Sequence, residues 1–524
     1  MLTRFLLLLM LLTLPLAGWA DAFGEALELL LERKFADKEQ AVPALMVTGD
    51  ERVRPLLQAL LQGELRYRAS DRQIYFPRDG KSIAVLSGQA LGEIAPSEAK
   101  KINLNNRMRS QIKSALAELN LAHADPAKRL QAVNALLGSL DAETIEVLRK
   151  RQQSESDESV LEVMALALSI ADLGSGDEAK TLAAIAQLEG SLNAQIRGEL
   201  LRLQQTAESE AVQTAAARAL ASIQARLDWY ATLETLFFGL SLGSVLVLAA
   251  IGLAITFGVM GVINMAHGEL IMLGAYTTYV VQLLLPNHIG ISLFIAIPAA
   301  FIVSGLVGIL IQRGVIRYLH GRALETLLAT FGISLILQQA VRSIFSPLNR
   351  SVETPAWMSG SWQVNEVLSL TLNRMYIILF CLLVFALLFW ILKRSRLGLQ
   401  VRAVSQNRAM ARSMGVRSEW VDALTFGLGS GIAGIAGVAL SQLTNVGPNL
   451  GQSYIIDSFM VVVFGGVGNL WGTLVAGLSL GVANKLLEPW SGAVLAKILV
   501  LVFIILFIQK RPRGLFPQKG RAAT

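Results

Sequence analysis

Long runs of apolar residues dominate the chain from Leu233 onward. Seven stretches approach the roughly 20 apolar residues that a membrane-spanning helix needs: residues 233–257, 269–285, 291–312, 325–345, 375–392, 421–441 and 493–509. An eighth stretch, 455–488, is too long for one span and is interrupted by Gly465-Gly466-Val467-Gly468-Asn469. The pattern predicts an all-α, polytopic membrane domain in which some helices are broken.

Residues 23–228 follow a different pattern. After Asp125-Pro126, apolar residues recur three and four positions apart up to Leu137, and residues 158–170, 194–203 and 211–223 behave similarly. Short paired helices spaced by roughly 30–40 residues predict a HEAT-like stack. Between these helices and the N-terminus, residues 66–68 and 73–76 look extended and residues 77–80 look like a turn, so we expect a small β-hairpin.

The first 22 residues have the features of a secretory signal peptide. Arg4 supplies the positive start, residues 5–14 form an apolar core, and Ala20-Asp21-Ala22 is a small-x-small cleavage site. An uncleaved first anchor is the alternative. In both cases we expect residues 23–228 to be exported.

Three clusters of basic residues predict the orientation of the membrane domain. They lie within residues 313–322, 393–417 and 510–521, and basic loops favour the cytoplasmic side. An exported N-terminal domain then requires an odd number of crossings, and splitting residues 455–488 at the glycines gives nine. The predicted organisation is a signal peptide (1–22), a periplasmic helical domain (23–228), a transmembrane domain (229–517) and a cytoplasmic tail (518–524).

Composition narrows the functional classes. The chain is 53% hydrophobic and 16% charged, and residues 229–524 hold 9 of the 39 acidic but 20 of the 46 basic residues. Because the basic excess lies beside apolar spans, membrane topology explains it, and we expect no nucleic-acid partner. The single cysteine, Cys381, excludes a disulfide within the chain and a cysteine zinc site, and four scattered histidines argue against a histidine-rich metal site. No cofactor or metal is expected.

Two serine motifs have a structural interpretation. Residues 239–243 and 477–481 both read Gly-Leu-Ser-Leu-Gly, a pattern found around hydrolase nucleophiles. Such a nucleophile follows a strand, whereas both copies lie in apolar spans, so we interpret them as helix-packing sites and expect no catalytic residue. Residues 79–82 resemble the end of a phosphate-binding loop, but Tyr75 stands where the first glycine is required, so the chain alone cannot hydrolyse ATP.

Two glycine-containing interruptions carry polar side chains. Residues 258–269 contain Asn264, His267 and Glu269, and residues 465–472 contain Asn469 and Trp471. Polar groups at membrane depth are costly unless they face protein or a cavity. Paired interruptions in two halves of a membrane domain point to a transport site where they meet. The alternative is an interfacial loop with hydrated His267 and Glu269.

Residues 233–517 resemble the permeases of branched-chain amino acid and amide ABC importers. The resemblance rests on ITFGVMGVINMAHGE at residues 255–269, FGGVGNLWG at 464–472 and RGLFP at 513–517. The run NVGPNLGQSYIIDSFM at 445–460 is similar to the urea-permease branch, in which an exported N-terminal domain of this size also occurs. The resemblance implies a subunit that imports urea, or a similar small amide, across the bacterial inner membrane for nitrogen uptake.

The resemblance also implies partners. These are a second permease subunit in a heterodimer, two cytoplasmic ABC ATPases and a periplasmic substrate-binding protein, with membrane lipid around the subunits. The helical, basic segment 398–415 would be the ATPase coupling loop, and its small residues would allow close docking: Gly398, Ala403, Ala409, Ala411 and Gly415. The alternative is a solvated loop that only sets topology.

A neutral amide needs hydrogen-bonding groups along its path rather than fixed charge. The predicted path residues are Asn264, His267, Glu269, Asn445, Asn449, Gln452, Asn469 and Trp471. The rival function is a secondary transporter or urea channel with a fused periplasmic receptor domain. A paired intramembrane charge would favour such a protein, and the sequence offers no convincing pair, since Asp457 is near an outer end.

Overall fold

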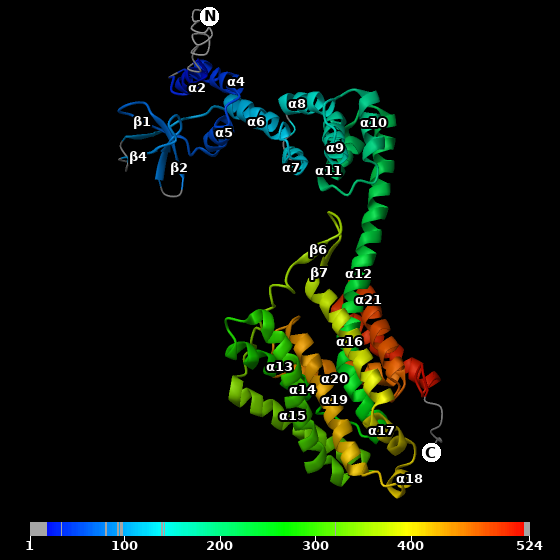
Figure 1. The fold of residues 1–524 in the computed structure, drawn as a ribbon. Coiled ribbons are helices and arrows are strands. Elements are labelled where there is room, and N and C mark those ends of the chain that lie inside the picture. Colours follow the sequence, from blue (N-terminus) through cyan, green and yellow to red (C-terminus); the bar gives the residue numbers. More distant parts are fainter. Residues whose placement is uncertain are drawn as a thin grey trace, which may run out of the picture. The chain divides into compact units, whose positions relative to one another are not determined.

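The computed structural model describes residues 18–517, apart from 33, 79–80, 92–93, 95–97, 138–139, 141 and 320 (Figure 1). The chain divides into two compact units, Met1–Gln224 and Ala225–Thr524. Most of the predicted signal peptide, residues 1–17, and the predicted tail, residues 518–524, lie outside the described residues. Residues 18–22, which include the predicted cleavage site, form the start of helix α2.

The first unit is mainly helical. Its helices are α2 (Gly18–Leu29), α3 (Phe35–Lys38), α4 (Ala41–Thr48), α5 (Val53–Gln62), α6 (Asn106–Leu121), α7 (Pro126–Leu136), α8 (Ala142–Gln152), α9 (Glu158–Leu173), α10 (Glu178–Leu188) and α11 (Ala194–Thr206). Five of them follow an Asn or Asp whose side chain accepts a hydrogen bond from a backbone N–H of the first turn, which satisfies a donor that the helix itself leaves free. The HEAT-like arrangement stays a prediction.

A five-stranded antiparallel sheet lies between α5 and α6 in the sequence. Its strands are β1 (Arg66–Arg68), β2 (Ile74–Arg78), β3 (Lys81–Ala84), β4 (Ala90–Leu91) and β5 (Ala99–Lys101), in the order β4-β3-β2-β1-β5. We predicted only one hairpin, with a turn at 77–80. Pro77 and Arg78 instead extend β2 and pair with Ser82 and Lys81 of β3. Residues 79 and 80 lie outside the described part.

The second unit is a bundle of long helices (Figure 1). They are α12 (Glu210–Met260), whose first residues belong to the first unit, α13 (His267–Leu284), α14 (Ile289–Gly314), α15 (Ala323–Phe345), α16 (Leu372–Arg394), α17 (Arg396–Gln406), α18 (Arg408–Ser413), α19 (Ser418–Ser441), α20 (Leu450–Gly465) and α21 (Leu470–Lys510). A short 3-10 helix (Ile316–Leu319) and the two-stranded β6 (Ser361–Gln363) and β7 (Ser369–Thr371) complete it.

The predicted all-α polytopic fold is confirmed. Among the described residues, six helices are long and apolar enough to cross a membrane, namely α12, α14, α15, α16, α19 and α21. The predicted interruption of 455–488 is present between Gly465 and Leu470. Helix α21 is interrupted again at Gly492, whose φ of 77° and ψ of 160° are non-helical.

Glycines bring the helices of the second unit into close contact. A Cβ atom at Gly481 of α21 would overlap the backbone of Gly243 in α12, so the two Gly-Leu-Ser-Leu-Gly motifs pack against each other and need no catalytic interpretation. Four glycines of α19 lie equally close to atoms of α13 and α14: Gly427, Gly431, Gly434 and Gly437.

Candidate functional site

One face of α15 carries a polar side chain every four residues. The members of this polar stripe are Thr326, Thr330, Ser334, Gln338 and Arg342. Residues four apart lie close to the same face of a helix, and the first four of these side chains are buried. Buried polar side chains need partners, and the partners come from α13 and its N-terminal connection.

Glu269, in the first turn of α13, is the central partner of the stripe. Its Oε1 accepts hydrogen bonds from Ser334 Oγ at 3.0 Å and Gln338 Nε2 at 2.7 Å. The residue is 1% exposed, and Oε2 has no hydrogen-bond partner among the described residues. The positive end of the α13 dipole favours a carboxylate at this position. Oε2 is therefore a buried hydrogen-bond acceptor that no described donor satisfies.

The connection between α12 and α13 packs against the same stripe. Thr330 Oγ1 accepts a hydrogen bond of 3.1 Å from the backbone N–H of Met265. His267 is completely buried, and its Nε2 lies 2.8 Å from the carbonyl oxygen of Ala249. The alternative of a hydrated interfacial loop is therefore wrong for both His267 and Glu269.

The two glycine-containing interruptions are in contact and are built alike. A Cβ atom at Gly258 would overlap Cα of Gly468. Each interruption has a glycine with positive φ three residues before an asparagine, at Gly261 and Gly466. We predicted from the sequence that the two interruptions meet, and their backbones are in contact.

The asparagines of the two interruptions each accept a hydrogen bond from a backbone N–H close to the start of a helix. Asn264 Oδ1 accepts a hydrogen bond of 3.0 Å from the backbone N–H of Ala266, and Asn469 Oδ1 accepts one of 3.1 Å from Gly472. Asn469 Nδ2 also donates to the carbonyl oxygen of Phe516 at 3.2 Å. Asn469 is the N-cap of α21, whereas Asn264 bonds to Ala266, the residue that precedes α13. Contact of either asparagine with a solute stays a prediction.

The remaining predicted path residues lie at the surface of the described unit. Asn445, Asn449 and Gln452 are exposed around the α19–α20 connection. Asn449 Oδ1 accepts a hydrogen bond of 2.8 Å from Arg342 Nη2, which joins it to the polar stripe. Trp471 is also exposed and packs on α16, with its ring centroid 5.1 Å from that of Phe385.

Part of the predicted coupling loop is buried. Ala411 belongs to a small core with Val401, Val404 and Val421, and a Cβ atom at Gly398 would overlap the backbone of Leu392. We therefore correct the docking role of Gly398 and Ala411, since both hold the loop together. Ala409 and Gly415 are exposed and Ala403 is half-buried.

An ion pair attaches α18 to α19, and two methionines in or next to α18 are exposed. Arg408 makes two hydrogen bonds to the buried carboxylate of Asp422, at 2.7 and 2.9 Å, and these fix the start of α18 to α19. Met410 and Met414, four residues apart, are strongly exposed. These methionines were not predicted as functional residues, although large apolar residues in a basic loop are a recognisable signal.

Comparison with known proteins adds an independent observation. A family model described as "Branched-chain amino acid transport system / permease component" matches residues 235–508. The branched-chain amino acid permease BraD of Pseudomonas aeruginosa is 32% identical over 297 residues, which are 55% of this chain and 96% of that protein. LivH of Escherichia coli is 30% identical over 294 residues, 54% and 94% of the two chains. The ribose import permease RbsC of Escherichia coli is 24% identical over 265 residues, 48% and 78%.

Proposed function

Because the chain belongs to the family of branched-chain amino acid transport permeases, we propose that it is the membrane-spanning subunit of an ABC importer for urea or a similar small amide. It is a multi-pass membrane protein and a transport subunit rather than an enzyme. The solute, the partner subunits and the orientation in the membrane are the properties that we propose here.

Glu269 Oε2, which has no hydrogen-bond partner in the described part of the chain, supports the proposal for the solute. A small amide is neutral, has N–H donors for Glu269 Oε2, and has a carbonyl oxygen that accepts from a donor such as Gln338 Nε2. Polar groups at every fourth residue of α15 are about 6 Å apart along the helix axis. Movement between Asn449 and Thr326 would therefore proceed between neighbouring hydrogen-bonding groups, without transfer of a bare polar molecule into hydrocarbon.

A free amino acid is the second candidate solute. The stripe region contains a carboxylate, Glu269, and a guanidinium, Arg342, which have the charges needed for the ammonium and the carboxylate of an amino acid. The similar proteins named above include permeases for branched-chain amino acids and for ribose. Direct competition between solutes distinguishes the two candidates.

The proposed partners are a second permease subunit, two cytoplasmic ATPases and a periplasmic binding protein. The exposed Met410 and Met414 support an ATPase contact, because apolar side chains on a short surface helix fit a groove in a partner. The basic segments 313–322 and 393–417 support a cytoplasmic location for this end of the bundle. The N-terminal unit would then be periplasmic, and the bundle would lie in the inner membrane.

Uptake measurements in bacterial cells that express the complete transporter test this function. We expect uptake of radiolabelled urea that acetamide and formamide inhibit, and that stops when the ATP sites of the partner ATPases are inactivated. Uptake of leucine that urea does not inhibit would favour the amino acid alternative. Urea uptake that continues with inactive ATPases would support the rival channel or secondary transporter instead.

A further inference from the structure

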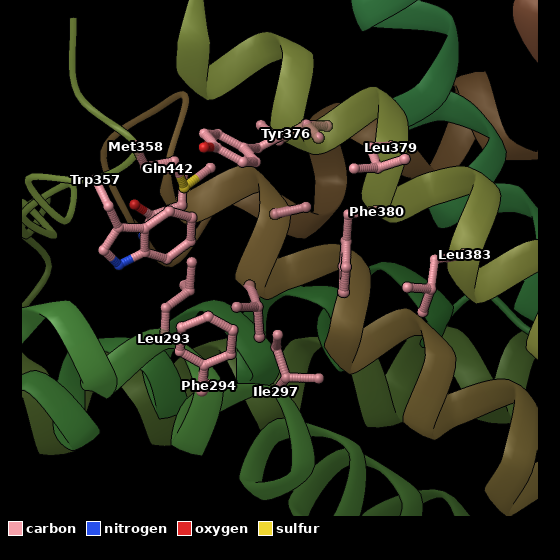
Figure 2. Close-up of a pocket in the computed structure, with 13 residues that line it drawn as sticks. Leu293, Phe294, Ile297, Trp357, Met358, Tyr376, Leu379, Phe380, Leu383 and Gln442 are labelled. Atoms are coloured by element: carbon pink, nitrogen blue, oxygen red, sulfur yellow. The ribbon is translucent and has the colours of Figure 1, made fainter.

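A cavity of about 250 Å³ lies among α14, α16, α19 and the α15–α16 connection (Figure 2). It is separate from the polar stripe, and the proposed function does not use it. Apart from Gln442, Trp357 and Tyr376, its lining consists of aliphatic, phenylalanine and methionine side chains. A cavity of this composition takes an apolar ligand.

One end of the cavity is amphipathic. In Figure 2, Trp357, Met358 and Gln442 lie together at that end. The Trp357 ring stacks on Phe294 at 5.4 Å between centroids and donates through Nε1 to the carbonyl oxygen of Gly290 at 2.9 Å. Gln442 is 5% exposed, its Nε2 donates to Ser441 Oγ at 3.3 Å, and its Oε1 has no partner among the described residues.

The unpartnered Gln442 Oε1 points to a ligand that carries a donor. A buried acceptor without a hydrogen bond costs free energy, and an N–H or O–H from a bound molecule would remove that cost. The group sits at the wall of an apolar cavity. The ligand that fits therefore combines an apolar body with a polar, hydrogen-donating end.

The position of the cavity along the helices matches the membrane boundary. Gln442 directly follows the last residue of α19, Tyr376 lies in the first turns of α16, and Trp357 lies in the connection that precedes α16. Tryptophan and tyrosine concentrate where hydrocarbon meets the headgroup layer. Away from this end, the cavity continues between Ile297 of α14 and Leu383 of α16.

The open side of the cavity faces outward from the bundle. Phe294 of α14 and Leu379 and Leu383 of α16 line it and are each more than half exposed. In a helix that crosses the bilayer, such side chains face hydrocarbon. A ligand can therefore enter sideways from the lipid, with no need to cross the protein.

We propose that this cavity binds a membrane phospholipid, with an acyl chain between α14 and α16 and a headgroup N–H or O–H donating to Gln442 Oε1. An acyl chain fits the apolar end between Ile297 and Leu383, and the aromatic pair Trp357 and Tyr376 lies at headgroup depth. The site is independent of the transported solute, so its failure would leave the proposed function unaffected.

Photo-crosslinking of the complete transporter in lipid nanodiscs tests the proposal. The probe is phosphatidylethanolamine with a diazirine in one acyl chain, and mass spectrometry maps the modified peptides. We expect crosslinks in the α14 peptide containing Ile297 and the α16 peptide containing Leu383. Ala439→Phe should fill the cavity and reduce these crosslinks several-fold. The control Leu382→Phe also introduces a phenylalanine, at an exposed position of α16 outside the lining, and should leave them unchanged.

A second variant keeps the test decisive if Ala439→Phe does not accumulate. Gln442→Leu retains the approximate shape and removes the unpartnered acceptor, so crosslinking should again fall several-fold. Crosslinks that are equal in Gln442→Leu and Leu382→Phe would overturn the proposal. So would crosslinks of cavity residues to a second permease subunit in place of lipid, since the cavity would then belong to a subunit interface.

Discussion

The side chain of Gln338 donates a hydrogen bond of 2.7 Å to the carboxylate of Glu269, and both residues are buried. They are 69 residues apart in the chain. Ser334 donates to the same carboxylate oxygen, while the second oxygen is unpartnered within the described residues. The bond joins α15 to the start of α13, next to the interruption that separates α13 from α12. Its loss therefore affects both the packing of α15 and the proposed solute site.

Gln338→Leu should reduce uptake by about tenfold at an unchanged amount of protein in the membrane. The substitution leaves the Glu269 carboxylate with Ser334 alone, and loss of a hydrogen bond to a buried charged group costs about 1–3 kcal/mol. Initial rates of radiolabelled uptake measure the effect. The neighbouring Gln339 is exposed on the same helix, so Gln339→Leu is the matched control. Equal uptake by the two variants would remove Gln338 from the proposed path.

Gly481→Leu should destabilise the membrane unit by about 1–3 kcal/mol or more. The new side chain would meet the backbone of Gly243, which cannot rotate away. Gly332→Leu is the control, because a Cβ atom there has no atom within 4 Å. Thermal unfolding in detergent should show a lower midpoint for Gly481→Leu only. Similar midpoints would mean that α12 and α21 can separate at little cost.

The lengths of the apolar runs predicted the membrane helices well, because a bilayer permits little besides helices and closed barrels. The predicted start of the first span, residue 233, does not coincide with the start of the helix that contains it. Helix α12 begins at Glu210, and no glycine or proline occurs between that residue and Gly239 to end it. Hydropathy marks where a helix becomes apolar, whereas it does not mark where the helix begins.

The small sheet was underestimated for a physical reason. Strands β4 and β5 are two and three residues long and contain alanine and lysine, which have little β propensity. They exist because they pair with β3 and β1. Pairing with distant segments is a tertiary effect, and a local pattern does not report it.

The candidate site could be predicted only in part. Glu269 stood out because a charge at membrane depth is rare, but its partners on α15 were missed. The polar residues lower the mean hydropathy of α15 to 1.4, the lowest of the six spans named above, but that value still indicates a membrane helix. The four-residue spacing was the available signal for the stripe. The backbone hydrogen bonds of Asn264 and Asn469 were also missed, since asparagine bonds to nearby backbone N–H groups as readily as it binds solute.

Acid should destabilise the N-terminal unit through Glu155. Its carboxylate makes hydrogen bonds of 2.7 and 2.8 Å to the guanidinium of Arg129, and this pairing lowers the pKa of Glu155 to about 2. Since the pKa is lower in the folded state, the stabilisation is complete above the ordinary value of 4.5. It is lost as the pH falls toward 2, and amounts to about 3 kcal/mol.

Hydrogen exchange of full-length protein, followed in peptides covering α7 and α9, measures this effect. The parent should lose protection between pH 4.5 and about 2. Glu155→Gln should be less protected at neutral pH and nearly independent of pH in that window. Parallel loss of protection in parent and variant would show that another group controls acid unfolding.

The N-terminal unit should be outside the cytoplasm. A reporter enzyme that is active only in the periplasm, fused after residue 150, should be active, and the same reporter fused after residue 517 should be inactive. The reason is the basic content of residues 393–417 together with the signal-like start of the chain. An inactive reporter after residue 150 and an active one after residue 517 would show that the topology is the reverse of the one proposed. The proposed ATPase contact of α18 would then be wrong.

Met414→Glu should weaken the ATPase contact while leaving the fold intact. Met414 is 79% exposed directly after α18, and the Arg408–Asp422 pair holds α18 against α19. Substitution of Gly415 is a poorer test, because its φ of 84° strains any other residue.

A polar group buried without a partner costs about 1–3 kcal/mol, so co-purification of the ATPase with Met414→Glu and ATP-driven uptake should both fall by about tenfold. Gln400→Glu, at an exposed position of α17, is the control for added charge. If both variants retain uptake and bound ATPase, the 398–415 segment only sets topology. That result would support the alternative of a solvated basic loop. The ATPase would then dock on another part of the cytoplasmic surface.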